Sequence, residues 1–234
     1  MLKNTIGMDL MNKYSSFIIS HRPQMIQAVM DSIRPESVKW FDGTGYSSFS
    51  KLVNACVASA DTEIVIIMSD KVFPNPAHVK KVVDLINQGY GFVALYRFAF
   101  FGFKKQLMRE IGLMDERFAG GGFEDDDFYI RLHEANISMY ITEEIPYLKS
   151  HSSWDRTLCE SHFINKWIDT TAPTYDPTVK LSHNIIKRNL AEENYNYDLG
   201  PAVPTNFLNW DYTFCPISKP RKYMKVPKKP KEIK

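Results

Sequence analysis

The chain has 234 residues, of which 44% are hydrophobic and 24% charged, and its formal net charge is +2 at pH 7. This length and apolar content favour one sizeable globular domain with a buried core. The longest apolar runs, such as residues 64–68, are far shorter than the ~20 residues of a membrane span, and residues 1–13 lack the apolar stretch of a signal peptide. We therefore expect a cytoplasmic protein without a transmembrane segment.

The spacing of the cysteines and histidines indicates neither a redox pair nor a metal cage. The three cysteines, Cys56, Cys159 and Cys215, are far apart and none belongs to a Cys-x-x-Cys motif, which predicts reduced thiols. The six histidines are equally dispersed. A structural zinc site is therefore not expected.

The charge is distributed unevenly along the chain. Residues 216–234 contain eight Lys or Arg and one Glu, a local balance of +7, so the remainder carries about +2 minus 7, or −5. Prolines separate these basic residues, and such a composition cannot bury apolar surface. We expect a solvated tail, or a linker to a further C-terminal domain, in preference to a nucleic-acid-binding segment.

The first half of the chain alternates between apolar runs and helical patterns. Strands are predicted at residues 14–20, 38–41 and 63–68, and helices at residues 25–33, 49–60 and 77–87. This alternation is typical of a parallel sheet with helices on its faces, whose ligands bind at the carboxyl ends of the strands.

The second half is less regular. We predict strands at residues 92–96 and 138–142, an aromatic segment at 98–103, and helices at 104–111, 124–135, 155–169 and 181–193. The predicted fold is a single α/β domain with a mostly parallel central sheet and helices on both faces. Residues 1–12 form an extension, residues 13–215 the domain, and residues 216–234 the tail.

Polar residues follow each of the first three strands. Ser20, His21 and Arg22 follow the first, Asp42 the second, and Ser69 and Asp70 the third. A parallel sheet brings these strand ends together along one rim, where they are candidates for ligand binding. These residues also have structural alternatives. Asp42 precedes a glycine and could be an ordinary turn residue, and Asp70 could cap the turn that follows it. Arg22 could pair with a surface acid.

The densest polar motif in the chain is a run of three glycines followed, after Phe123, by four carboxylates. Gly120, Gly121 and Gly122 allow close approach of backbone to a ligand, and residues 124–127 are all acidic. One interpretation is a capped helix start, with Asp127 paired to Arg131 at i,i+4. The other is a general base at a helix mouth.

The strand ends ISHRP, FDGTG and MSDK, followed by GLMDERFAGGGFEDDDFYIRL, resemble the GT-A nucleotide-sugar glycosyltransferases, especially the large family 2 type. The match covers roughly residues 13–155 and is most specific at residues 112–118 and at Glu124 and Asp125. It implies a single GT-A (Rossmann-like) domain, with nucleotide binding in residues 13–97 and acceptor binding and catalysis in 98–215. The chain is also similar to sugar transferases of large algal DNA viruses, which would place it in the cytoplasm of a host cell.

The resemblance implies a set of donor-binding residues. The donor is a nucleotide sugar, UDP-linked in most lookalikes, with GDP and dTDP left open, and its implied contacts are Ser20, His21, Arg22, Asp42, Ser69, Asp70, Gly121 and Gly122. The expected cofactor is Mn²⁺ or Mg²⁺ on Asp70 and His151. The family's Asp-x-Asp motif is incomplete, because Met68-Ser69-Asp70 retains one acid. His151 has the alternative of a structural residue.

The resemblance also implies the chemistry at the acid cluster. Asp125 is the expected general base for a glycan hydroxyl, and Glu124 and Asp127 either orient it or bind acceptor hydroxyls. Backside attack then inverts the anomeric centre. Retention of configuration stays open, because motif spacing does not fix the position of the acceptor. A non-catalytic nucleotide-sugar or glycan-binding module is the alternative from another class.

Overall fold

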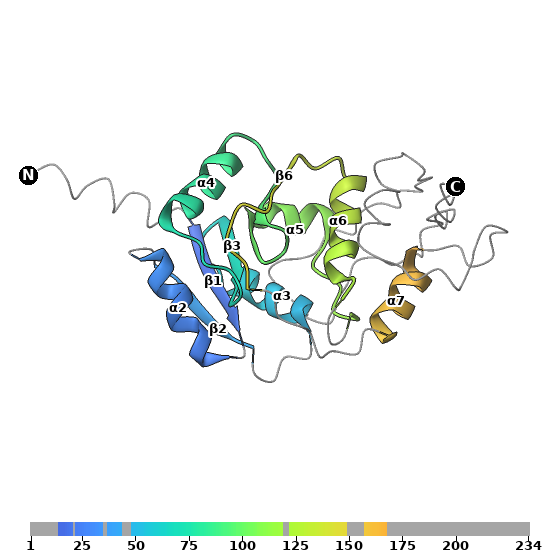
Figure 1. Cartoon of the computed structure of the whole chain (residues 1–234). Coiled ribbons are helices and arrows are strands. Elements are labelled where there is room, and N and C mark those ends of the chain that lie inside the picture. The colour runs from blue at the N-terminus through green and yellow to red at the C-terminus, as the bar shows by residue number, and fades with distance from the viewer. Residues whose placement is uncertain are drawn as a thin grey trace, which may run out of the picture.

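The structure is a computed structural model that describes residues 14–20, 22–34, 37–43, 48–118, 122–148 and 157–167 (Figure 1). The strands are β1 (Tyr14–Ser20), β2 (Lys39–Asp42), β3 (Ile64–Ser69), β4 (Phe92–Tyr96), β5 (Phe100–Lys104) and β6 (Met139–Ile141). The helices are α2 (Pro23–Ile33), α3 (Phe49–Ser59), α4 (Pro76–Asn87), α5 (Lys105–Ile111), α6 (Glu124–Glu134) and α7 (Thr157–Trp167). The predicted extension 1–12, helix 181–193 and tail 216–234 lie outside these ranges.

The strands form one six-stranded sheet in the order β2-β1-β3-β5-β4-β6. β1 pairs in parallel with β2 and β3, and β4 pairs in parallel with β6. β5 is antiparallel to both of its neighbours, so the other five strands run in one direction. The predicted α/β fold with a mostly parallel sheet is confirmed.

The helices cover both faces of this sheet, and each face has its own apolar core (Figure 1). The first core contains Phe17, Val65, Ile67, Phe92 and Phe101 from the strands, packed against side chains of α3, α5 and α6. The second contains Ile18, Ile66, Met68 and Val93, packed against α2 and α4. Alternate residues of one strand enter opposite cores, as expected for a strand that is buried on both sides.

β5 was not predicted as a strand. Residues 98–103 read as an aromatic segment, because four phenylalanines in six residues do not show the alternation of a half-buried strand. Instead, Phe101 and Phe103 fill one core and Phe100 the other. Gly102 makes room for α4, since a Cβ at this position would lie 2.6 Å from Cγ1 of Val82.

Side-chain caps fix the starts of two helices. Oγ of Ser48 accepts a hydrogen bond from the backbone N–H of Lys51 at 3.2 Å, which caps α3. Asn75 and His78 form a reciprocal capping box at α4, which begins at a proline. These signals explain why both helices begin within one residue of the predicted positions.

Two further expectations concern the described part of the chain. Cys56 and Cys159 are buried and carry free thiols, whereas Cys215 lies outside the described residues. Within the described ranges, no helix combines the length and the apolar character that a bilayer crossing requires.

Candidate active site

The carboxyl ends of β1 and β3 meet in a compact polar cluster of Ser20, Arg22 and Asp70. Arg22 donates from Nε to Oδ2 of Asp70 at 2.8 Å and from Nη2 to Oδ1 at 2.5 Å. Oγ of Ser20 also donates to Oδ2 of Asp70, at 2.5 Å. The hydrogen bond with Asp70 is the main cause of a raised pKa of Arg22. Arg22 and Asp70 therefore form a bidentate, charge-assisted pair.

The other predicted rim residues lie beside this cluster. Asp42 pairs in register with Ser20 at the end of β2 and is exposed. The indole N–H of Trp40 donates to the carbonyl of Ser20 at 3.3 Å, and the ring is exposed. Oγ of Ser69 accepts from the backbone N–H of Lys71. The sheet thus gathers Ser20, Arg22, Asp42, Ser69 and Asp70 at one rim, whereas His21, Gly121 and His151 lie outside the described residues.

A later segment of the chain runs along the same rim. Tyr147 forms an isolated antiparallel bridge with Val72, and the backbone N–H of Leu148 donates to the carbonyl of Lys71 at 2.8 Å. The ring of Tyr147 stacks on Tyr96, at the end of β4, with centroids 4.5 Å apart. The chain therefore passes next to Asp70 three residues before His151.

The side chains that the structure describes near Asp70 offer few ligands to a divalent cation. In residues 14–148 and 157–167, apart from the gaps given above, no group of three His, Cys, Asp or Glu side chains could hold a metal ion. Mg²⁺ commonly binds through one or two carboxylates together with waters and substrate phosphates, not in an all-protein cage. Asp70 and the hydroxyl of Ser20 fit that mode, provided that Arg22 leaves the carboxylate.

The acid cluster begins α6 in an unusual backbone conformation. Phe123, at the N-cap position, has φ of 68°, in the left-handed region, and its side chain makes no capping hydrogen bond. Gly122 has φ of 113°, which side chains rarely adopt. Its N–H donates to Oε2 of Glu124, and the N–H of Asp126 donates to Oδ1 of Asp125 at 3.1 Å. The first turn is thus held partly by its own acids.

Glu124 has the most informative protonation behaviour in this turn. Burial raises the pKa of Glu124 to about 8, and the charge of Asp125 adds to the effect. At neutral pH this carboxyl is mostly protonated and can donate a hydrogen bond. Asp125 is half-buried. The pair therefore places a neutral acid next to a more accessible carboxylate.

The raised pKa of Glu124 makes folding stability depend on pH. Between its ordinary pKa of 4.5 and the folded value of about 8, the folded protein keeps a proton that the unfolded chain has released. Stability from this group is therefore full below pH 4.5 and falls as the pH rises to 8. Glu124→Gln should remove this decline and be more stable than wild type at pH 8.5, by roughly 1–4 kcal/mol.

Urea unfolding between pH 5 and 8.5 measures this effect. Glu143→Gln is the control, because Glu143 is exposed and paired to Arg97. A parallel decline in wild type and Glu124→Gln would show that Glu124 ionises normally.

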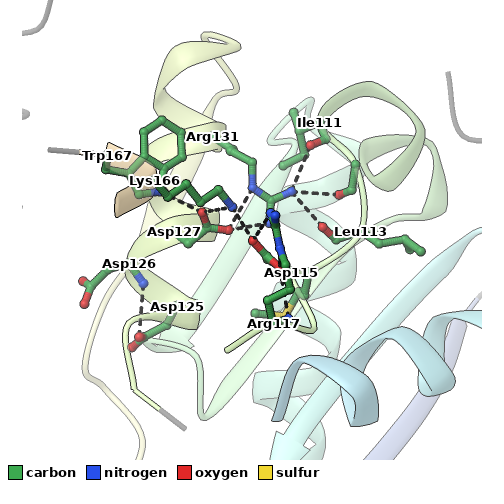
Figure 2. A network of polar contacts seen from close by, with 12 residues as sticks. Ile111, Leu113, Asp115, Arg117, Asp125, Asp126, Asp127, Arg131, Lys166 and Trp167 are labelled. Atoms are coloured by element: carbon green, nitrogen blue, oxygen red, sulfur yellow. Dashed lines mark hydrogen bonds and ion pairs between the residues drawn. The ribbon is translucent and has the colours of Figure 1, made fainter. Parts of the chain in front are cut away.

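A buried ionic network holds α6 and α7 to the loop at residues 112–118 (Figure 2). Nζ of Lys166 donates to Oδ2 of Asp115 at 2.7 Å and also contacts Oδ1 of Asp127. The indole N–H of Trp167 donates to Oδ1 of Asp127 at 2.8 Å. Arg131 donates to Oδ2 of Asp127 from Nε and Nη2, at 3.2 and 3.0 Å. Lys166 therefore bridges two carboxylates that are both fully buried.

The same network positions the loop. Nη1 of Arg131 donates to the carbonyls of Ile111, Gly112 and Leu113. Asp115 accepts from both Arg117 and His162 in addition to Lys166. Burial alone would raise the pKa of Asp115, but these hydrogen bonds and the lysine charge lower it. The pKa of Asp127 is lowered for a similar reason, since Lys166 and Arg131 outweigh its burial.

Asp127 has a structural role, as the i,i+4 spacing to Arg131 also allowed. The predicted i,i+4 pair with Arg131 is present, and both carboxylate oxygens have donors. Figure 2 shows Asp125 and Asp126 pointing away from Lys166. Of the three predicted catalytic acids, Asp127 is thus the one that Arg131, Lys166 and Trp167 hold.

Sequence reasoning missed several residues that build the site. Lys166, Trp167 and His162 lie on α7, and spacing carries no signal for a contact across 40 to 51 positions. Asn54 had a detectable signal, because it interrupts an apolar run. Its amide donates to the carbonyl of Met114 and to Glu116, and accepts from the N–H of Met114, which fixes the same loop from α3.

One turn contacts both halves of the candidate site. The backbone N–H of Ser69 donates to the carbonyl of Ala99 at 2.8 Å. The preceding ring, Phe98, packs edge-on against Phe128 in α6, with centroids 6.0 Å apart. The strand end that carries Asp70 and the helix that carries Asp125 are thus joined through residues 98–99.

No protein-family model matches the chain, and no curated protein matches it. Similar solved structures include two of Drosophila β-1,4-galactosyltransferase 7, each 11% identical to this chain. The first, a mutant in complex with manganese, UDP-Gal and xylobiose, has a TM-score of 0.41 and covers 75% of this chain and 79% of its own. The second, a catalytic domain in complex with xylobiose, has a TM-score of 0.43 and covers 84% of each chain. At this level of similarity, the fold assignment rests on the strand order and register of the chain itself.

Proposed function

We propose that the chain is a glycosyltransferase of the GT-A class that moves a sugar from a nucleoside diphosphate sugar, UDP-linked in the first instance, to a hydroxyl group of a glycan. The observation that supports this most is the grouping of Ser20, Arg22 and Asp70 where two parallel strands end. Ligands of open α/β sheets bind at such strand ends. The turn that links this rim to the acid-rich start of α6 supplies the second half of the site.

The donor occupies the rim in this proposal. Arg22 binds the diphosphate, because its planar guanidinium matches two phosphate oxygens. Asp42, exposed at the neighbouring strand end, contacts the base or ribose. Gly122, and Gly121 and His21 from outside the described residues, complete the contacts.

Asp70 would hold a divalent cation, with Ser20 next to it and His151 as a further ligand. Mn²⁺ suits this set better than Ca²⁺, since an imidazole takes part. When bound, the cation neutralises the departing diphosphate. Asp70, directly after β3, would orient the cation.

The acceptor reacts at the start of α6. The acceptor hydroxyl oxygen attacks the anomeric carbon, the bond from that carbon to the diphosphate oxygen breaks, and the hydroxyl proton passes to Asp125. Glu124, protonated at neutral pH, donates a hydrogen bond to an acceptor oxygen. Attack from the side opposite the diphosphate inverts the anomeric centre. We assign Asp127 the positioning of this turn.

A non-catalytic nucleotide-sugar-binding module is the second candidate. It is favoured by the Arg22–Asp70 pair, which engages the one acid of the incomplete metal motif. The two candidates differ in turnover, because a binding module would bind UDP-sugars and release no UDP. An assay for UDP release in the presence of glycan acceptors separates them.

The donor and cation are tested by thermal unfolding with UDP, GDP or dTDP, each with and without Mn²⁺. UDP plus Mn²⁺ should stabilise the fold more than the sum of the two alone. At a hundredfold excess over Kd the gain is about 2.7 kcal/mol, a rise in Tm of roughly 5–10 °C for a domain of this size.

Asp70→Ala should abolish the synergy and leave the protein without ligand folded. Asp84→Ala is the matched control, because Asp84 is exposed on α4 and paired to Lys80. Equal shifts in the presence of EDTA would contradict a metal site.

A further inference from the structure

Arg22 engages both oxygens of the carboxylate that the proposed cation needs. Its two hydrogen bonds to Asp70 measure 2.8 and 2.5 Å, and Ser20 donates a third. The Asp70 side chain is 6% exposed and that of Arg22 is 28% exposed. The guanidinium therefore covers the carboxylate from the solvent side.

Arg22 occupies the side of the carboxylate that a metal ion would use. Mg²⁺ lies about 2.0–2.1 Å from its ligand oxygens, and Arg22 places N–H groups and positive charge against both oxygens of Asp70. Removing Arg22 from Asp70 also leaves a buried carboxylate without its partner, which is costly. A metal ion and Arg22 therefore compete for the carboxylate of Asp70.

A diphosphate offers Arg22 an alternative partner. Guanidinium binds phosphate oxygens in the same two-pronged geometry as a carboxylate. Arg22 lies at the N-cap position of α2, and its backbone N–H is already held by Oγ of Ser20 at 2.8 Å. A change of partner therefore requires movement of the side chain alone.

We propose that Arg22 is a latch that holds Asp70 closed until a nucleoside diphosphate arrives. This inference rests on the proposed function and adds an order to it. The diphosphate draws Arg22 away, and the freed carboxylate then accepts the cation. A protein whose binding-competent state is populated at about 1–10% binds with only about 1–10% of the affinity of that state. The latch thus keeps affinity for free Mn²⁺ about 10- to 100-fold lower than the open site would have.

The test is a titration of Mn²⁺ into the full chain, with the electron paramagnetic resonance signal of free Mn²⁺ as the readout, with and without UDP. UDP should tighten Mn²⁺ binding to wild type at least tenfold. Arg22→Met should bind Mn²⁺ alone about 10- to 100-fold more tightly than wild type, and the further gain on adding UDP should be smaller than in wild type by a similar factor.

Two further variants separate the latch from a simple charge effect. Arg22→Lys keeps the charge but cannot form the two-pronged pair, so it should also bind Mn²⁺ alone more tightly than wild type. Arg97→Met removes a positive charge that follows β4 and is paired to Glu143, and should behave as wild type.

The outcomes distinguish the two proposals. If wild type binds Mn²⁺ with UDP, but Arg22→Met and Arg22→Lys bind Mn²⁺ alone no better than wild type, the latch is wrong and the proposed function stands. If only Arg22→Met gains affinity, charge repulsion and not a latch governs the site. If wild type binds neither UDP nor Mn²⁺ in any combination, the proposed function fails and the latch fails with it.

Discussion

Asp125→Asn is expected to lower sugar transfer by ~10²–10⁴-fold and to leave donor affinity within about twofold of wild type. The amide matches the carboxylate in shape but cannot accept the proton of the acceptor hydroxyl. Most donor contacts are assigned to the rim at Arg22 and Asp70, which follow β1 and β3, whereas Asp125 lies in α6. A base that also orients the nucleophile should give a loss toward the upper end of this range.

Single-turnover transfer and calorimetric donor binding measure the two effects separately. Asp84→Asn is the control for an exposed acid on α4. Glu124→Gln tests the neighbour, and because Glu124 is mostly protonated at pH 7 its amide variant should lose less activity than Asp125→Asn. If Asp125→Asn transfers sugar within a few-fold of wild type, Asp125 is only an acid at the start of a helix.

Among the substitutions that we propose, Lys166→Met is expected to lower the free energy of unfolding most. It leaves Asp115 and Asp127 buried without the cation that they share. Removing one partner of a buried ion pair typically costs about 3–5 kcal/mol. We expect the lower end, about 3 kcal/mol, because Arg117 and Arg131 still donate to the two acids.

Urea unfolding at pH 7 measures this loss. Lys80→Met is the matched control, since Lys80 is exposed in an i,i+4 pair with Asp84 and should change stability by less than about 0.5 kcal/mol. Adding Asp127→Asn to Lys166→Met removes one uncompensated charge and should recover part of the loss. Equal stability of Lys166→Met and Lys80→Met would show that the network contributes little.

Most of the fold could be predicted from local patterns. The apolar runs and the helix-start residues place β1, β3 and β4 and the helices α2 to α6 within about two residues. β5 was missed because a strand that is buried on both faces has an apolar sequence without the alternation of a half-buried strand. Its pairing with β3 and β4 is a long-range feature that its own residues do not indicate.

The candidate site was likewise predicted only in part: its strand-end residues were predicted and its long-range contacts were not. Strand ends brought Ser20, Arg22 and Asp70 to one rim as predicted, because parallel strands share a direction. The pairing of Arg22 with Asp70 was not predicted, because the two alternatives for Arg22 were a surface acid and the diphosphate of a donor. The ion pair between Lys166 and Asp115 could not have been predicted, because it depends on how α7 packs against the domain. No regular spacing in the sequence indicates a contact between residues 51 positions apart.

The ionic network also has a consequence for synthesis. Asp115 and Asp127 leave the ribosome before their shared cation, with Lys166 lying 51 positions after Asp115. Lys166 follows Asp127 by 39 positions, so at ~5–20 residues per second the growing chain spends roughly 2–8 s with both acids made and Lys166 not yet made. Arg117 and Arg131 can pair with the two acids in that interval, but the buried network at residues 112–118 and the first turn of α6 is completed only after Lys166 and Trp167 have emerged. The buried network around the start of α6 is therefore completed well after its two acids have been made.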